Sequence, residues 1–142
     1  MIRRATADDV DAMAAMFRLS FRSIGGLPEL HTPEEDRQHY GRLVREYEAW
    51  VEDDDGIVGL AVLNGDELDA LYVAPERQRS GVGSRLFATV TKQRPAGFTF
   101  WVFQHNERAR RFYEGHGCRA VKFTDGAGNE ERTPDVLYEW RP

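Results

Sequence analysis

The sequence is poor in the features that mark secreted and membrane proteins. It has one cysteine, Cys118, among 142 residues, so no disulfide can form within the chain. A lone thiol fits a reducing compartment. The longest apolar run is the seven residues Ile57–Leu63, whereas a membrane-spanning helix needs ~20. The N-terminus reaches the acids Asp8 and Asp9 where a secretory signal needs an apolar stretch. We therefore expect a cytoplasmic protein with no membrane partner.

The sequence also lacks an excess of positive charge. Its 19 Lys and Arg against 24 Asp and Glu give a formal net charge of −5. Proteins that follow a nucleic-acid backbone need a positive face, so we expect no nucleic-acid partner. Hydrophobic residues make up 41% and charged residues 30% of the chain, a balance typical of globular proteins. The length predicts one domain, residues 1–142.

Hydrophobic periodicity along the chain alternates between helix and strand spacing. The predicted strands are Ile2–Ala5, 49–52, 57–63, 67–73, 98–103, 118–123 and 136–140, and the predicted helices follow Thr6, Thr32, Gly81 and Asn106. Turn signals at Asp55-Gly56 and Asn64-Gly65 join three of the strands into an antiparallel meander. The order β-α-α-β-β-β-α-β-α-β-β predicts a mixed α/β (α+β) single domain.

The second helix has a strong start signal. Thr32 is a capping residue, Pro33 suits the first helical position, and Glu35 is the acid of a capping box. The acidic run Glu34-Glu35-Asp36 is interpreted as solvent-exposed surface that matches the helix dipole.

A glycine loop, Gln78-Arg79-Ser80-Gly81-Val82-Gly83, lies between a predicted strand and a predicted helix. Glycine lets the backbone approach an anion, and a helix N-terminus supplies unpaired amides, so this is a candidate pyrophosphate cradle. The dinucleotide pattern fails because Leu86 occupies the third glycine position, and the P-loop pattern lacks its Gly-Lys-Ser/Thr ending. An ordinary helix start is the alternative.

Two motifs in order resemble the GNAT superfamily, the Gcn5-related N-acetyltransferases. The first is Gln78-x-x-Gly81-x-Gly83 after Leu71–Glu76, and the second is Asn106-x-x-Ala109-x-x-Phe112-Tyr113-Glu114-x-x-Gly117. The resemblance is densest from Glu67 to Val121. It implies a central mixed, mainly antiparallel sheet flanked by helices, and acetyl-CoA as co-substrate. We expect no metal ion, because His39, His105 and His116 show no ligand spacing with one another or with Cys118.

The resemblance also implies which residues bind the co-substrate. The loop residues that would hold the pyrophosphate are Gln78, Arg79, Ser80, Gly81, Val82, Gly83 and Ser84. Leu71, Tyr72 and Val73 would pair with the pantetheine arm, and a backbone N–H there would polarise the thioester carbonyl. Asn106 would contact the same arm, although it is also a good helix N-cap. Arg79 and Arg85 are candidate phosphate partners, and Arg79 stands where relatives often have glycine.

The catalytic candidates are one phenol and two carboxylates. Tyr113 occupies the general-acid position of the family, where a phenol with a pKa near ~10 can protonate a thiolate; the alternative is a core aromatic. Glu67 and Asp69, predicted on one strand face with Leu68 and Ala70 opposite, are candidate bases or cation-binding groups; the alternative is an ordinary acidic strand. His31 is a further candidate base, with a solvated loop histidine as its alternative.

We therefore expect an acetyl-CoA-dependent N-acetyltransferase that works by direct attack in a ternary complex. The acceptor is an amine on a small molecule or a protein, either a protein N-terminus or a lysine. The alternatives are a non-catalytic acyl-CoA-binding regulatory domain and a nucleotide-binding module. Cys118 is interpreted as a buried structural thiol. Dimerisation is common in the family, so the strand Val136–Trp140 is a candidate homodimer contact by analogy.

Overall fold

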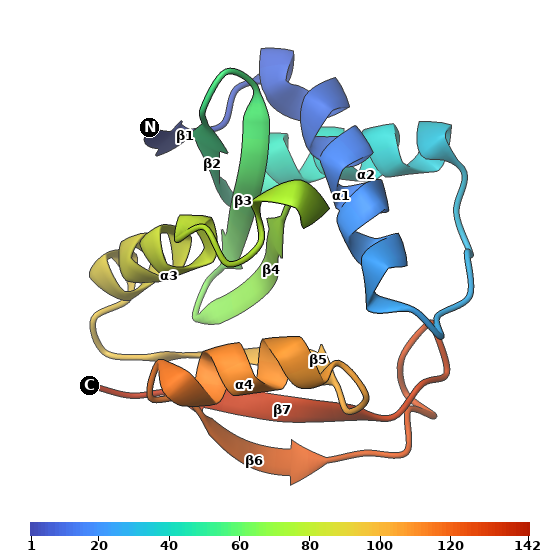
Figure 1. The fold of residues 1–142 in the computed structure, drawn as a ribbon, viewed down its shortest axis with the longest axis vertical. Coiled ribbons are helices and arrows are strands. Elements are labelled where there is room, and N and C mark those ends of the chain that lie inside the picture. The colour runs from blue at the N-terminus through green and yellow to red at the C-terminus, as the bar shows by residue number, and fades with distance from the viewer.

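Seven strands form one sheet in a computed structural model that describes residues 1–142, and helices cover both faces of that sheet (Figure 1). The strands are β1 Ile2–Arg4, β2 Glu48–Asp53, β3 Ile57–Asn64, β4 Glu67–Val73, β5 Phe98–Phe103, β6 Arg119–Phe123 and β7 Asp135–Trp140. The helices are α1 Val10–Ile24, α2 Pro33–Glu46, α3 Val82–Gln93 and α4 Glu107–Gly115, with short 3₁₀ turns at Ala7–Asp9 and Pro75–Arg77. The predicted element order is confirmed.

The sheet has the order β1-β2-β3-β4-β5-β7-β6 and is antiparallel except at one place. That place is the β4–β5 pair, which is parallel and holds register only at Glu67 and Thr99. The Thr99 amide donates to the Asp66 carbonyl at 3.0 Å. Beyond this point β4 and β5 separate, so the second half of β4 has a neighbour on one side only. This opening in the middle of the sheet positions the site.

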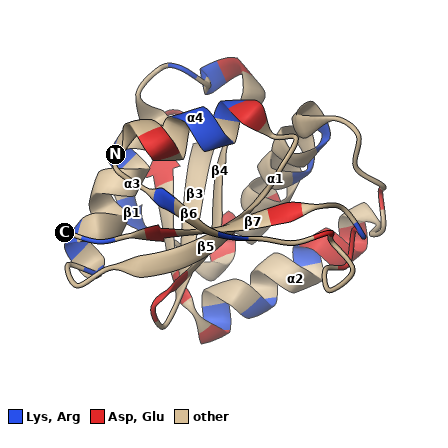
Figure 2. Ribbon diagram, turned by 90° about the horizontal axis from the view of Figure 1, so that it is seen from below, with Lys and Arg blue, Asp and Glu red and all other residues tan.

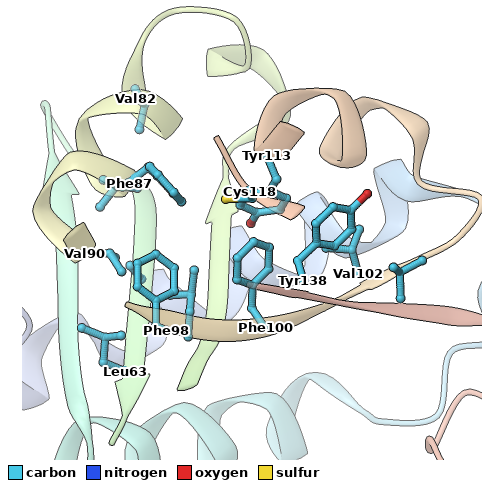
Figure 3. Close-up of a cluster of buried hydrophobic side chains, with 14 of the residues drawn as sticks. Leu63, Val82, Phe87, Val90, Phe98, Phe100, Val102, Tyr113, Cys118 and Tyr138 are labelled. Atoms are coloured by element: carbon cyan, nitrogen blue, oxygen red, sulfur yellow. The ribbon is translucent and has the colours of Figure 1, made fainter. Parts of the chain in front are cut away.

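Each face of the sheet has its own apolar core. On one face, α3 and α4 cover the cluster drawn in Figure 3, in which Phe87, Phe98 and Phe100 are almost fully buried. On the other face, α1 and α2 bury Met13, Tyr40 and their neighbours against β2 and β3. Burial of this apolar surface is the main force that fixes the two helix pairs on the sheet.

The start of α2 confirms one prediction and corrects another. Glu35 N donates to Thr32 Oγ1 at 3.1 Å and Thr32 N donates to Glu35 Oε1 at 2.9 Å, which is the predicted capping box. Asp36, however, is not exposed: it is 7% accessible and accepts a hydrogen bond from Arg18 Nη1 of α1 at 2.9 Å. The prediction that the whole acidic run is solvent-exposed surface is wrong, because α1 supplies a guanidinium that lets one of its carboxylates be buried.

The closing strand is interior to the sheet. β7 pairs with β5 on one side and with β6 on the other. The sheet edge at this end is β6, so β7 has no free backbone edge for pairing with a second chain. The sequence analogy that suggested a dimer through Val136–Trp140 therefore fails for strand pairing.

No helix of the structure combines the length and apolar character needed to cross a membrane.

Candidate active site

A β-bulge at Asp69 sets the direction of the side chains along β4. Val62 pairs with Ala70 and Leu63 pairs with Leu68, so Asp69 is an extra residue on β4. Leu68 therefore packs in the core under α3, whereas Ala70 packs in the core under α1 and α2. The predicted simple alternation, with Leu68 and Ala70 on one face, is wrong because the extra residue Asp69 shifts the alternation of side chains by one position.

A cavity of about 760 Å³ lies where β4 and β5 separate. Ten of the twelve residues predicted to bind the co-substrate or to protonate its thiolate line it: Leu71, Tyr72, Val73, Gln78, Arg79, Gly81, Gly83, Ser84, Asn106 and Tyr113. The other two do not. Val82 is fully buried in the core, and the Ser80 hydroxyl donates to the Arg77 carbonyl. We call this space the donor cavity.

The glycine loop enters α3 in a conformation that only a glycine adopts without strain. Gly81, the N-cap, has φ 91°. The first helical hydrogen bond joins Arg85 N to Gly81 O at 3.0 Å, so the amides of the first turn before Arg85 have no acceptor in the protein. A Cβ on Gly83 would stand 3.2 Å from Phe112 Cε1. The loop therefore presents unpaired amides in a space with no room for side chains, which is the chemistry of an anion cradle.

The arginines near this loop differ in role. Arg79 lines the donor cavity and adopts the left-handed conformation, with φ 64°. Arg85 instead donates from Nε to the buried Glu52 carboxylate at 2.8 Å. The prediction that Arg85 serves a phosphate is therefore not supported, because its guanidinium already compensates a buried charge. Arg108 and Arg111 of α4 also line the cavity.

The open edge of β4 exposes backbone groups to the donor cavity. Ala74 N donates to Val58 O at 2.9 Å, and Tyr72 is paired with Leu60. Because antiparallel ladders direct alternate residues to the same neighbour, Leu71 and Val73 direct their amides away from β3, into the gap left by β5. These unpaired amides can donate hydrogen bonds to a carbonyl oxygen of a pantetheine chain or of a thioester.

Tyr113 is at once a core aromatic and a cavity residue. Its ring packs 4.3 Å from that of Phe100 between centroids (Figure 3), and the residue is 7% exposed. Its hydroxyl has no hydrogen-bond partner in the protein, yet no buried polar atom is unsatisfied, so the oxygen opens onto the cavity. Burial, with the Tyr72 hydroxyl nearby, raises the pKa of Tyr113. The phenol therefore stays protonated at neutral pH.

Two features of the donor cavity have no clear signal in the sequence. Ser20, Ser23 and Ile24 at the end of α1 form part of its wall. The His105 ring connects the two sides, with Nε2 2.7 Å from the Gly25 carbonyl oxygen. Asn106 caps α4 as predicted, accepting from Ala109 N at 3.3 Å. The glycine pair Gly25-Gly26 marks the end of α1, but nothing in the pair predicts a contact with a histidine eighty residues away.

A second cavity, of about 570 Å³, lies between α1, α2 and the far side of β4. We call it the acceptor cavity. Asp69 lines it and Glu67 does not. Burial and the Asp69 carboxylate raise the pKa of Glu67, which lies near Asp69 but at the start of the strand. Tyr72 is the one residue that lines both cavities, so the two spaces meet at this residue.

Two other predicted residues have defined places. His31 lines the acceptor cavity, but it is paired with Glu130 of the loop before β7 and lies 3.9 Å from Glu35 Oε2. Cys118 is 7% exposed in the core under α3 and α4, and burial raises the pKa of its thiol to about 12. The interpretation of Cys118 as a buried structural thiol agrees with this position in the core.

A sequence model described as "Acetyltransferase (GNAT) domain" matches residues 45–118, more than half of the chain and the part that contains β4, the glycine loop and α4. The chain belongs to the GNAT acetyltransferase family. The predicted GNAT resemblance is thereby confirmed.

Known proteins are similar to this GNAT chain in sequence or in fold. Peptidyl-lysine N-acetyltransferase YiaC of Escherichia coli (strain K12) is 32% identical over 94 residues, which are 64% of this chain and 62% of that protein. The chain thus spans less than two thirds of this relative. A GCN5-related N-acetyltransferase from Rhodopseudomonas palustris superposes with a TM-score of 0.84 at 21% identity, over 100% of this chain and 95% of that one. PaiA N-acetyltransferase from Thermoplasma acidophilum, solved with coenzyme A, has a TM-score of 0.77 at 16% identity, over 100% and 98%. The predicted GNAT-like fold is confirmed.

Proposed function

We propose that this GNAT chain is an acetyl-CoA-dependent N-acetyltransferase that transfers an acetyl group to a primary amine by direct attack in a ternary complex. One observation carries the proposal: a cavity with an anion cradle and a cavity with acidic walls meet at a single residue, Tyr72. A donor and an acceptor bound in the two spaces would react without a covalent enzyme intermediate, because proximity replaces it. The peptidyl-lysine activity in the name of the E. coli relative supports an amine acceptor.

The donor cavity fits acetyl-CoA on three counts. The amides at the start of α3 suit a pyrophosphate. The open edge of β4 at Leu71 and Val73 suits the amides of a pantetheine arm. Arg79, Arg108 and Arg111 add positive charge around an anionic ligand on a protein whose net charge is negative. The coenzyme A bound to PaiA from Thermoplasma acidophilum supports the same assignment in a related fold.

Three groups of the chain would act in the reaction: a β4 amide, Tyr113 and Asp69. The acetyl thioester supplies an activated carbonyl carbon, and a β4 amide from Leu71 or Val73 donates to its oxygen. The amine nitrogen forms a bond to that carbon as the carbon–sulfur bond breaks. Tyr113 donates its phenolic proton to the departing sulfur. Of the two protons lost by the ammonium nitrogen, one leaves through Asp69 or a water beside it, and the other restores the Tyr113 hydroxyl.

Asp69 is the better placed of the two predicted bases. It lies on the bulge, lines the acceptor cavity and is exposed there. Glu67 is outside the lining, and the charge of Asp69 contributes to its raised pKa. We keep Glu67 as a secondary candidate and assign the proton-accepting role to Asp69.

We also propose that residues 1–142 act as one N-acetyltransferase domain in the cytoplasm and need no metal ion. The sheet is continuous from β1 to β6 and has a core on each face, which supports one structural unit. Every step above is assigned to an amide, a phenol or a carboxylate of the chain.

The decisive experiment combines acetyl-CoA-dependent thiol release over a panel of amines with calorimetric binding of coenzyme A. Thiol release that depends on both acetyl-CoA and an amine supports the proposal. Tight coenzyme A binding without release from any amine would instead identify a non-catalytic acyl-CoA-binding domain. Displacement of coenzyme A by ATP or NAD at similar concentrations would identify a nucleotide-binding module.

A further inference from the structure

The charges lining the acceptor cavity are unevenly paired. Its wall contains three arginines, Arg18, Arg22 and Arg42, and six carboxylates, Glu29, Glu35, Asp36, Asp69, Glu130 and Glu131. Every arginine has an acidic partner: Arg18 pairs with Asp36 at 2.9 Å, Arg22 with Glu29, and Arg42 with Glu46 at 3.3 Å. No cationic side chain of the wall is therefore left free to receive an anionic group of a ligand.

Four of the six carboxylates are also engaged. Glu29 and Asp36 hold arginines, Glu35 closes the capping box of α2, and Glu130 pairs with His31. Asp69 and Glu131 form no salt bridge and no side-chain hydrogen bond. Both line the acceptor cavity together with Tyr72. Burial raises the pKa of the Tyr72 phenol, and the charges of Glu131 and Asp69 raise it further. Two carboxylates without a partner therefore share this cavity with Tyr72, the residue that also lines the donor cavity.

A buried hydroxyl points to the same place independently of these charges. Tyr40 of α2 is 1% exposed and lines the acceptor cavity, and its hydroxyl has no hydrogen-bond partner. Because no buried polar atom of the protein is unsatisfied, this oxygen opens onto the cavity. Burial, with the Tyr72 hydroxyl and the Asp69 carboxylate nearby, raises the pKa of Tyr40. An unpartnered hydroxyl in the wall of a cavity can accept a hydrogen bond from a ligand donor.

The walls around these oxygens are aromatic. The Phe17 ring stands 4.9 Å from that of Tyr72 and 5.2 Å from that of Tyr40 between centroids, and Phe21 continues the wall. Such rings pack against methylene chains and favour cations over anions at their faces. His39, also in the lining, has a pKa lowered by burial and by Arg42, so it adds no positive charge at neutral pH.

Resting on the proposed function, we propose that the acceptor is a dicationic amine: a flexible chain with one ammonium group at Asp69, Tyr40 and Tyr72, and a second positive charge at Glu131. The first ammonium gives up its proton and reacts, while the second stays charged and holds the chain. A monoammonium ligand would leave one carboxylate unpaired, and an acceptor with its own carboxylate would find no free cation. A free diamine and a lysine beside a second basic residue share this chemistry.

The proposal is tested with acceptors of equal chain length and different charge. The small-molecule arm compares 1,5-diaminopentane with pentylamine and with 6-aminohexanoate, at saturating acetyl-CoA. The peptide arm compares capped peptides in which one lysine is flanked by lysine or by glutamate. We expect kcat/KM about tenfold higher for the dicationic member of the preferred arm, mostly through KM, because one additional charge-assisted contact forms. The arm with the higher kcat/KM identifies the source of the acceptor.

Variants then locate the effect. Glu131→Gln should reduce the ratio of diamine to monoamine kcat/KM toward one. Asp69→Asn should raise the KM and lower the kcat of every amine, because the amide neither pairs with the ammonium nor accepts its proton. Glu34→Gln, a carboxylate at the start of α2 outside the cavity lining, is the matched control and should keep the wild-type ratio. Equal or higher kcat/KM for the monoamine or the zwitterion, or an unchanged ratio in Glu131→Gln, overturns the proposal.

Failure of the proposed function is recognised separately. If no amine releases thiol, calorimetry with 1,5-diaminopentane alone still measures the cation site, in the wild type and in the Asp69→Asn/Glu131→Gln double variant. Binding that the double variant loses supports the dication site without the reaction. No heat of binding in the wild type overturns it.

Discussion

The donor and acceptor cavities are built from different parts of the polypeptide. The donor cavity presents backbone amides, from the first turn of α3 and the open edge of β4, and three arginines with one carboxylate, Glu107, in its lining. The acceptor cavity presents side chains, with six carboxylates and three arginines. In Figure 2, red and blue segments alternate along α2 and α4, so neither helix carries one sign of charge alone. The opposite local charges of the two cavities therefore depend on which few charged residues line each cavity.

This difference predicts opposite responses to mutation. A site made of amides tolerates the loss of most side chains but not the addition of one, because an added side chain would fill the space that the ligand occupies. A site made of side chains responds to the loss of each charged group. The four predictions below test this contrast, beginning with the largest effect.

Replacing Gly81 by tryptophan should abolish coenzyme A binding. The residue has φ 91°, and a Cβ would meet Arg85 Nη1 at 3.0 Å even before the indole is placed. We expect no measurable heat of binding in calorimetry at ligand concentrations that saturate the wild type. Gly65→Trp serves as the control, since Gly65 also has positive φ but lies in an open turn outside the cavity. Wild-type affinity in Gly81→Trp would remove the glycine loop from the site.

Tyr113→Phe should lower kcat by about 10²-fold with little change in coenzyme A affinity, because the phenol acts on the leaving sulfur and not on binding. Tyr138→Phe is a matched control. Its hydroxyl accepts from Arg110 and donates to Glu114 in the same core, but it does not line the cavity. That variant should lose stability and keep its turnover. Equal kcat for Tyr113→Phe and the wild type would leave Tyr113 as a core aromatic alone.

The folding of the acceptor wall depends on the Arg18–Asp36 pair. Arg18→Ala should destabilise the protein by about 1–3 kcal/mol, because Asp36 remains buried without its partner. The measurement is urea unfolding. Arg37→Ala, which removes an exposed pair with Glu34 on the same helix, is the control and should change stability far less. Unfolding midpoints that coincide for the two variants would contradict a structural role for Arg18.

The same contrast explains what the sequence reveals. The donor cavity is predicted by local sequence patterns: a strand, the glycines at fixed offsets that follow it, and a helix cap at Asn106. Ten of its predicted residues therefore line the cavity. The bulge at Asp69 results from the pairing register of β3 and β4, which no local pattern encodes. The burial of Asp36 and the His105–Gly25 contact likewise join segments distant in sequence. The fold order was predictable because each element has its own periodicity, whereas the acceptor wall arises from tertiary pairing.

The smallest predicted effect concerns Arg79. This residue holds φ 64°, a conformation that costs a non-glycine residue about 1 kcal/mol, while its side chain lines the donor cavity. Arg79→Gly removes the strain and the charge together, and Arg79→Ala removes the charge but keeps the strain. If amides dominate donor binding, both variants should bind coenzyme A within about tenfold of the wild type. Arg79→Gly should also unfold at a higher urea concentration than Arg79→Ala. A hundredfold loss of affinity in both variants would show that a side chain, and not the backbone, carries the anion there, and the contrast between the two cavities would no longer hold.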